Sequence, residues 1–237
     1  MGKMFPFITG TWNPVRGPCP YDCSYCWAKS LIKRYGYVKY QGPTRLDEKA
    51  MWKIPDKGFI FVQDMSDIST LGAQDANILM AELKAHPKAT YLLLTKNPIW
   101  YLNMFGEGVI FPDNIVFGAT IETNEEIKCS QAPSPGARFW GLQHVHTWMP
   151  DAKTFISVEP IMEFNLYQMI NGILDAKPWA VAVGYDNYRN RLPEPPLEKT
   201  RTLIKCLREA GITVYEKTLR EAWNSGAAEA RVNGDNS

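Results

Sequence analysis

The sequence predicts an α/β fold in which a parallel sheet curls into part of a (β/α) barrel. Strand and helix signals alternate along the chain, an order that produces parallel strands joined by helical crossovers. The expected strands are short and apolar, as is typical of strands buried on both faces. A length of 237 residues suits one such domain. We therefore expect a single domain over residues 1–223 and a flexible tail over residues 224–237.

The first strand is predicted at Phe5–Thr11, where the residues are aromatic or β-branched. A loop punctuated by proline and glycine follows it and leads to a helix that begins at Trp27 and ends near Gly36. The next stretch, Tyr37–Lys57, mixes tyrosine, glycine and basic residues. It predicts a long surface connection with one short helix at Asp47–Trp52.

The rest of the chain predicts six more strands. They are expected at Phe59–Val62, Thr90–Thr95, Ile115–Ala119, Thr154–Val158, Trp179–Val183 and Ile212–Tyr215. Helices are expected at 76–83, 98–105 and 196–210, the last of them stopped by Gly211. Residues Ser130–Met149 break the alternation, and a displaced helix is expected there.

The bulk composition excludes several classes of protein. The formal net charge is +1, so no overall charge attracts the chain to nucleic acid or to an acidic membrane. No apolar run approaches the ~20 residues that span a bilayer, and the N-terminus has too short an apolar region for a signal peptide. A cytoplasmic protein that does not bind membranes is expected.

Three cysteines, Cys19, Cys23 and Cys26, follow the spacing C-x3-C-x2-C, and Tyr25 stands directly before the last. Three thiolates in one short loop can bind three irons of a [4Fe–4S] cluster and leave the fourth iron open. Zinc is the alternative, but zinc usually takes four ligands in paired spacings, and the other cysteines are isolated. A disulfide is disfavoured by the odd total of five cysteines.

The cysteine pattern resembles the signature of the radical S-adenosylmethionine (radical SAM) superfamily. The resemblance implies that Cys19, Cys23 and Cys26 bind a [4Fe–4S] cluster whose open iron chelates SAM. It implies an enzyme that cleaves SAM reductively to a 5′-deoxyadenosyl radical, which abstracts hydrogen from a substrate, with flavodoxin or ferredoxin as reductant. It also implies a partial (β/α)6 TIM-like barrel, or that barrel with one extra strand.

Four shorter runs resemble a narrower group, the phage protein Gp37/Gp68-like family of small radical SAM proteins. These runs are residues 11–15, 65–67, 94–98 and 157–160, with the sequences TWNPV, MSD, LTKNP and SVEP. The resemblance extends from the first expected strand to the last. It implies no particular reaction.

Polar residues follow every expected strand, and in a parallel barrel these positions meet at one edge of the sheet. After the second strand, the radical SAM resemblance assigns the SAM ammonium to Asp64, Ser66 or Asp67. That segment lacks the two glycines that are common at this place in the superfamily.

The remaining SAM contacts are expected at other strand ends. A ribose contact after the fourth strand is expected from Thr120, Glu122 or Asn124, which follow one another closely there. Glu159, which follows the fifth strand, is also a candidate, and the backbone of Tyr25 is expected near the adenine. Cys129 is a candidate catalytic thiol, because it lies near the expected mouth of the site.

The sequence leaves the substrate open. Aromatic residues interleave with basic ones in two stretches, which favours a nucleic acid or nucleotide. These residues are Lys33, Arg34, Tyr35, Tyr37, Lys39 and Tyr40, and then Tyr185, Tyr188, Arg189 and Arg191. A small metabolite is the second candidate. A different class is a non-catalytic Fe–S protein with a structural or redox-sensing cluster, which would not bind SAM.

Overall fold

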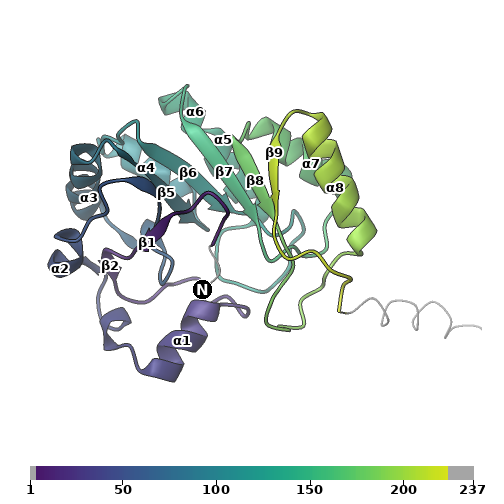
Figure 1. The fold of residues 1–237 in the computed structure, drawn as a ribbon, viewed down its shortest axis with the longest axis horizontal. Coiled ribbons are helices and arrows are strands. Elements are labelled where there is room, and N and C mark those ends of the chain that lie inside the picture. Colours follow the sequence, from purple (N-terminus) through teal and green to yellow (C-terminus); the bar gives the residue numbers. More distant parts are fainter. Residues whose placement is uncertain (1–3, 224–237) are drawn as a thin grey trace, which may run out of the picture.

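Seven parallel strands form one curled sheet, and their order in the sheet follows their order in the chain (Figure 1). The structure is a computed structural model that describes residues 4–223. The strands are β1 (Gly10–Trp12), β4 (Gly58–Val62), β5 (Ala89–Thr95), β6 (Ile115–Thr120), β7 (Lys153–Val158), β8 (Ala180–Val183) and β9 (Thr213–Glu216). This architecture is the partial TIM-like barrel that the sequence predicts, with one strand more than six.

Helices cover the convex face of the sheet (Figure 1). They are α3 (Ala73–Ala85), α4 (Ile99–Gly106), α5 (Pro135–Gln143), α6 (Val145–Trp148), α7 (Leu166–Asp175) and α8 (Leu197–Glu209). In α8 the buried residues Leu203, Ile204 and Leu207 recur every three to four positions and so form one apolar stripe. Gly211 adopts a φ of 84° just after this helix, a conformation that glycine adopts without steric cost.

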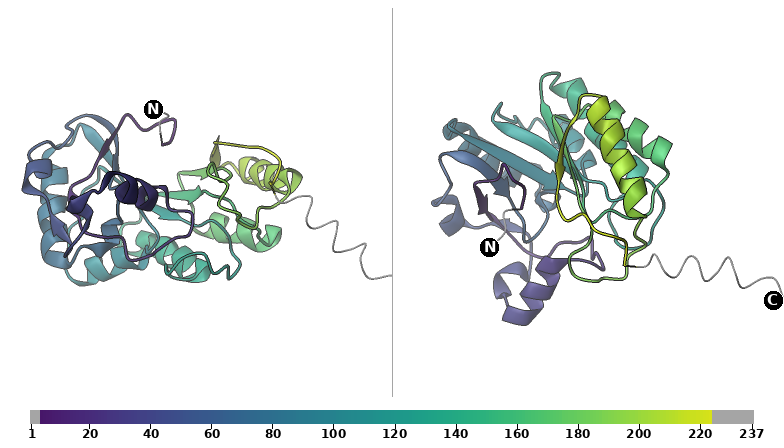
Figure 2. Two further views of the ribbon diagram at one scale, coloured as in Figure 1. Left: turned by 90° about the horizontal axis from the view of Figure 1, so that it is seen from below. Right: turned by 45° about the vertical axis from the view of Figure 1, so that its right-hand side comes forward.

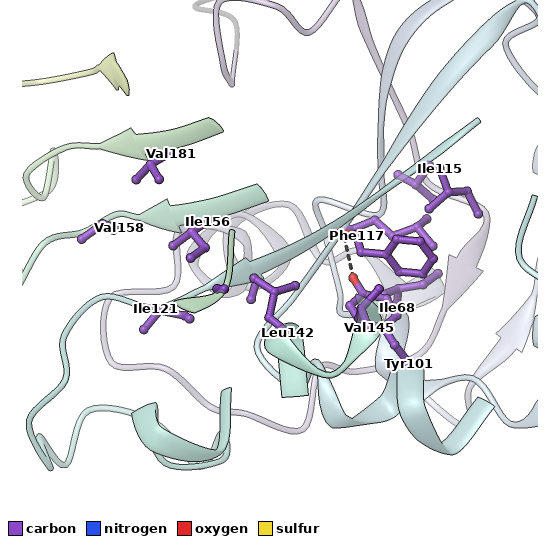
Figure 3. Close-up of a cluster of buried hydrophobic side chains, with 14 of the residues drawn as sticks. Ile68, Tyr101, Ile115, Phe117, Ile121, Leu142, Val145, Ile156, Val158 and Val181 are labelled. Atoms are coloured by element: carbon purple, nitrogen blue, oxygen red, sulfur yellow. Dashed lines mark hydrogen bonds between the residues drawn. The ribbon is translucent and has the colours of Figure 1, made fainter. Parts of the chain in front are cut away.

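The larger hydrophobic core lies between the convex face and these helices. Alternate strand residues such as Phe117, Ile156 and Val181 meet Leu142 and Val145 from α5 and α6 (Figure 3). Tyr101 of α4 is fully buried there, and its hydroxyl lies 2.6 Å from the Leu93 carbonyl oxygen and 3.0 Å from that of Gly118. This core fixes the helices against the sheet and leaves the carboxyl ends of the strands free for a site.

A second, smaller core covers the concave face of the sheet. Phe5 and Ile8 pack there against sheet residues that include Phe61 and Phe155, and the rings of Phe5 and Phe155 lie 4.9 Å apart. The predicted strand at Phe5–Thr11 is therefore wrong in its first half, because only Gly10–Trp12 pairs with β4. The aromatic residues that suggested a strand instead fill the curled sheet from within.

The connection between β1 and β4 contains more structure than the sequence predicts. The predicted helices are present as α1 (Trp27–Tyr35) and α2 (Glu48–Met51), and the short 3₁₀ helix η1 (Val38–Tyr40) is additional. Two short strands, β2 (Val15–Arg16) and β3 (Arg45–Leu46), form a separate antiparallel ribbon that was not predicted. A second 3₁₀ helix, η2 (Ile68–Thr70), follows β4. The expected displaced helix in residues 130–149 is confirmed as α5 and α6, whereas α7 was not predicted.

The expected tail at residues 224–237 lies outside the described residues. Within residues 4–223, no helix is long and apolar enough to cross a membrane.

Candidate functional site

The cysteine loop, residues 17–26, leaves the carboxyl edge of the sheet and leads into α1. All three of its cysteines are free: Cys19 is exposed, Cys23 is buried and Cys26 is partly buried. Asp22 turns the chain with a φ of 43°, and the Cys26 amide donates to the Cys23 carbonyl oxygen at 3.2 Å. The Cys26 sulfur caps α1 by accepting from the Lys29 amide at 3.4 Å. The three cysteines therefore lie in one short loop, in which a turn joins Cys23 to Cys26.

In residues 4–223, no three histidine, cysteine, aspartate or glutamate side chains converge closely enough to hold a metal ion. Burial raises the pKa of the Cys23 thiol, which favours its neutral form. Neutral thiols gain little from converging, whereas a metal cation favours thiolates and draws them together. The donor set, three free thiols in one loop, has the chemistry that a cluster needs.

The cysteine loop is held by the segment that follows β6. The Ser24 amide donates to the Cys129 carbonyl oxygen at 2.9 Å, and the Gln131 amide donates to the Tyr21 carbonyl oxygen at 2.7 Å. The Cys129 thiol itself donates to the Met162 sulfur at 3.7 Å. The structure thus brings Cys129, the candidate catalytic residue, beside the cysteine loop.

Below the loop lies a buried charge network centred on Glu122. One of its carboxylate oxygens binds the Lys96 ammonium and the Tyr25 hydroxyl, and the other accepts from Arg138 at 2.5 Å. Burial alone would raise the pKa of Glu122, but Lys96 and Arg138 outweigh it and lower the pKa to about 2. The Tyr25 hydroxyl also accepts from Lys96 at 2.9 Å. Both oxygens of Glu122, a predicted ribose contact, are therefore engaged within the protein.

The loop after β4 is immobilised through its backbone and leaves two polar atoms without partners. Asn13 accepts from the amides of Asp64 and Met65 at 3.0 and 3.2 Å, and Gln63 exchanges hydrogen bonds with the Val15 backbone. In contrast, Asp64 Oδ1 and Ser66 Oγ are buried and make no hydrogen bond within the described chain. Buried orphan oxygens are costly unless a ligand satisfies them. These two fit an ammonium group.

Asp67, the third predicted residue of this loop, is fully engaged in the protein. Its oxygens accept from the Thr95 hydroxyl at 2.6 Å, from the Lys96 amide at 3.0 Å and from Ser69. The structure therefore uses Asp67 to join the loops after β4 and β5.

Glu159 and Lys217 form an ion pair of 2.6 Å at the strand ends farther along the sheet. Burial raises the pKa of Glu159, and the Lys217 ammonium opposes this rise. Gly184 lies against the pair: a Cβ at this position would come within 2.9 Å of Lys217 Cβ. The close approach of these three residues requires a glycine.

Thr120 and Asn124 differ in what they can contact. Thr120 is buried at the end of β6, and its carbonyl oxygen accepts from Arg138 at 3.1 Å. Asn124 instead binds the backbone of Asn165, the residue that caps α7, in both directions, at 2.9 and 3.1 Å. Asn124 thus fastens its loop to α7.

The sequence did not single out Lys96, Arg138 or Lys217 as site residues. Lys96 and Lys217 lie at strand ends, but polar residues follow every strand, so this position alone did not distinguish them from other polar residues. Arg138 gave none, because it lies on α5, 16 residues beyond Glu122 in the chain. A surface hollow of about 650 Å³ between α2 and α3 includes none of the predicted site residues.

Comparison with known proteins gives one family and a set of similar folds. Residues 4–186 match the family model described as "Protein of unknown function (DUF5131)". No curated protein matches the chain. The matching model does not carry the phage Gp37/Gp68-like description, so that narrower resemblance is not confirmed.

Solved structures with the same fold are radical SAM enzymes at low sequence identity. Streptococcus suis SuiB bound to S-adenosylmethionine has a TM-score of 0.55 and 10% identity, over 90% of this chain and 50% of SuiB. SuiB bound to precursor peptide SuiA has a TM-score of 0.55 and 10% identity, over 94% of this chain and 52% of SuiB. A spore photoproduct lyase mutant with dinucleoside spore photoproduct has a TM-score of 0.54 and 11% identity, over 83% of this chain and 60% of the lyase. The chain thus spans about half the length of SuiB.

Proposed function

The chain belongs to the DUF5131 family, and we propose that it is a radical SAM enzyme that binds a [4Fe–4S] cluster on Cys19, Cys23 and Cys26. One observation carries the proposal. Three free cysteines with radical SAM spacing lie in the connection after the first strand of a sheet whose fold is that of radical SAM enzymes. When bound, the cluster and SAM would supply reductive cleavage of the sulfonium to a 5′-deoxyadenosyl radical.

The chain's own residues would bind and orient these groups. Asp64 and Ser66 are the preferred partners of the SAM ammonium, because Asp64 Oδ1 and Ser66 Oγ are buried and have no donor among the described residues. Thr120 and the Glu159–Lys217 pair are proposed to meet the rest of SAM from the facing strand ends, and the Tyr25 backbone its adenine. Asp67, Glu122 and Asn124 would then support the site by holding its loops.

The cellular compartment, the reductant and the role of Cys129 are also proposals. Five free cysteines suit a reducing, cytoplasmic setting, and flavodoxin or ferredoxin would supply the electron. Cys129 beside the loop is a candidate thiol for chemistry on the substrate. The resemblance to phage Gp37/Gp68-like proteins also remains a prediction.

The test is anaerobic reconstitution with iron and sulfide, reduction with dithionite, and chromatographic assay of 5′-deoxyadenosine in the presence of SAM. The wild-type protein is expected to bind about four irons per chain and to form 5′-deoxyadenosine. Cys23→Ala is expected to abolish both, whereas Cys206→Ala, which changes a cysteine of α8 outside the motif, is expected to preserve both.

Two results would contradict the proposal. A bound cluster without 5′-deoxyadenosine and without a SAM-dependent change in its EPR spectrum would identify a non-catalytic Fe–S protein. Stoichiometric zinc in place of iron would show that the cysteine pattern was misinterpreted.

A further inference from the structure

We propose that the substrate is a single-stranded nucleic acid, held across the site by two basic surfaces that flank the cysteine loop. The first surface, the basic lobe, is residues 27–45, from α1 through η1 to β3. The second, the arginine loop, is residues 184–196 between β8 and α8. This inference rests on the proposed function, because it names the substrate of that same site.

The basic lobe carries a high local positive charge, although the net charge of the whole chain is low. It contains Lys29, Lys33, Arg34, Lys39 and Arg45 and no acidic residue. The chain as a whole has a net charge of +1, so all other residues together carry −4. Lys29 forms an ion pair with Asp22 of the cysteine loop, and the other four cations have no acidic partner among the described residues. The lobe is therefore a local cationic surface on an otherwise acidic protein, which is the distribution that a polyanion recognises.

Exposed aromatic rings lie among these charges. Tyr35 and Tyr37 stack with their ring centroids 5.6 Å apart, and Tyr35 is 56% exposed. Arg34 lies over the Tyr35 ring at 5.5 Å, and Lys39 lies over the Tyr37 ring at 5.3 Å. Rings on which bases can stack, beside cations that can meet phosphates, are the two components of single-strand binding.

The arginine loop is rigidly built although it is exposed. Arg189 and Arg191 have φ values of 54° and 58°, a left-handed conformation that side chains other than glycine adopt at a cost. The buried Asp186 carboxylate stabilises this turn by accepting from the amides of Tyr188 and Asn190 at 3.0 and 2.6 Å. The result is a fixed turn that presents two arginines and one aromatic ring, Tyr188, which is 66% exposed.

A second set of contacts fixes the arginine loop from below. Arg220 donates to both carboxylate oxygens of Glu194, at 2.8 and 2.6 Å, and to the Asp186 carbonyl oxygen at 2.7 Å. Arg220 also lies over the Trp223 ring at 3.4 Å. Glu194 and Arg220 neutralise each other and Asp186 is buried, so Arg189 and Arg191 are the charges that the loop exposes.

Both surfaces lie at the same edge of the sheet as the cysteine loop. The basic lobe follows the cysteine loop directly, and the arginine loop follows the carboxyl end of β8. Figures 1 and 2 show α1 and the loop after β8 on the same side of the sheet. A single-stranded nucleic acid that contacts both surfaces would therefore pass over the cysteines. A small metabolite bound at the cysteine loop would contact neither surface.

The test is fluorescence anisotropy of the reconstituted protein with a labelled single-stranded oligonucleotide of about 20 nucleotides, as DNA and as RNA, over a range of salt. Binding is expected to weaken as salt rises, and the DNA or RNA oligonucleotide that binds is expected to stimulate 5′-deoxyadenosine formation at least tenfold. The double variant Arg189→Asn and Arg191→Asn keeps side chains that tolerate positive φ. It is expected to bind at least tenfold more weakly and to reduce the salt slope by about 1.4, the value for two phosphates.

Two further variants separate stacking from general attraction. Tyr35→Ala with Tyr37→Ala is expected to weaken binding about tenfold or more without changing the salt slope. The matched control, Lys57→Gln with Lys88→Gln, removes two exposed charges directly before β4 and β5, at the opposite edge of the sheet. It is expected to change neither binding nor SAM cleavage.

The outcomes distinguish this inference from the proposed function. SAM cleavage by a wild-type protein that binds no oligonucleotide would overturn the inference alone. Equal loss of binding in the arginine variant and in the lysine control would also overturn it, as would equal competition by polyglutamate, which would favour an acidic protein as partner. Oligonucleotide binding that depends on the arginine and tyrosine pairs, without any SAM cleavage, would support the two surfaces as a nucleic-acid binding site. It would overturn the proposal that the protein is a radical SAM enzyme.

Discussion

Glu122 joins three separate segments of the chain under the cysteine loop: Tyr25 of that loop, Lys96 after β5, and Arg138 of α5. A buried carboxylate with two cationic partners is stabilising only as a complete set, because removal of one member leaves the others unpaired. Lys96 is 16% exposed at its side chain and Arg138 is 7% exposed, so water would compensate little for the loss.

We predict that Glu122→Gln lowers the free energy of unfolding by about 3–5 kcal/mol, because it leaves two buried cations without a counter-charge. Chemical denaturation measures this value. Glu163→Gln is the matched control, since Glu163 also pairs with a lysine but is about half exposed; it should lose no more than about 1 kcal/mol.

The pH dependence of the unfolding free energy, compared between wild type and Glu122→Gln, separates the effect of charge from that of packing. The pKa of Glu122 is lowered from 4.5 to about 2 in the folded chain, so its contribution is complete above about pH 5 and is lost as the pH falls from there toward 2. The difference in unfolding free energy between wild type and Glu122→Gln should therefore shrink over that range. A difference that stays constant from pH 6 to pH 3 would show that packing, not charge, causes it.

Asp64 permits a prediction about ligand binding. Asp64→Asn should weaken SAM binding to the reconstituted protein at least tenfold, because a charge-assisted hydrogen bond to the ammonium contributes about 1.5–3 kcal/mol. Isothermal titration calorimetry measures the affinity, and the iron content should stay unchanged. Asp113→Asn, an exposed aspartate at the amino edge of β6, should leave both unchanged. Normal SAM affinity in the Asp64 variant would assign the ammonium to another residue.

At the scale of elements, the segment before β1 shows where sequence patterns are ambiguous. Phe5, Phe7 and Ile8 have the aromatic and branched character of a strand, yet they pack across the concave face of the sheet. A run of apolar residues shows that a segment is buried but does not show whether it pairs with a strand or covers one. The runs at β5 and β7 were predicted correctly, since neither proline nor glycine interrupts them, whereas Pro6 and Gly10 lie inside Phe5–Thr11.

We predict that Phe5→Ala lowers the free energy of unfolding by about 3–5 kcal/mol, since it removes a fully buried ring and leaves a cavity. Denaturant titration measures the loss. Tyr167→Ala, which truncates an exposed ring on α7, should change stability by less than about 0.5 kcal/mol. A small effect at Phe5 would mean that this segment is dispensable for the fold.

The candidate site was predictable only where local sequence encodes it. The cysteine spacing predicts Cys19, Cys23 and Cys26 as cluster ligands, and the polar residues after the second expected strand made Asp64, Ser66 and Asp67 candidates; both assignments stay predictions. The engagement of Asp67 and Glu122 within the protein was not predictable, because their partners come from loops and helices distant in sequence. Tertiary packing, rather than residue type, decides which polar side chains stay available to a ligand.

At the scale of the whole molecule, the order of the strands explains why one edge collects the chemistry. Every connection returns to start a new parallel strand, so each carboxyl end delivers its loop to the same side. β1 and β9 remain unpaired with each other among the described residues, which leaves the sheet as an open half-barrel. The cysteine loop and the arginine loop come from opposite ends of this order and still share one edge.

The separation of +5 in the basic lobe from −4 elsewhere gives the molecule an electric dipole although its net charge is only +1. A dipole exerts a torque on an approaching polyanion and orients the encounter so that the lobe arrives first. Two proteins with the same net charge can therefore differ greatly in association rate. For this chain, the rate constant of encounter, rather than the lifetime of the complex, should respond most strongly to ionic strength.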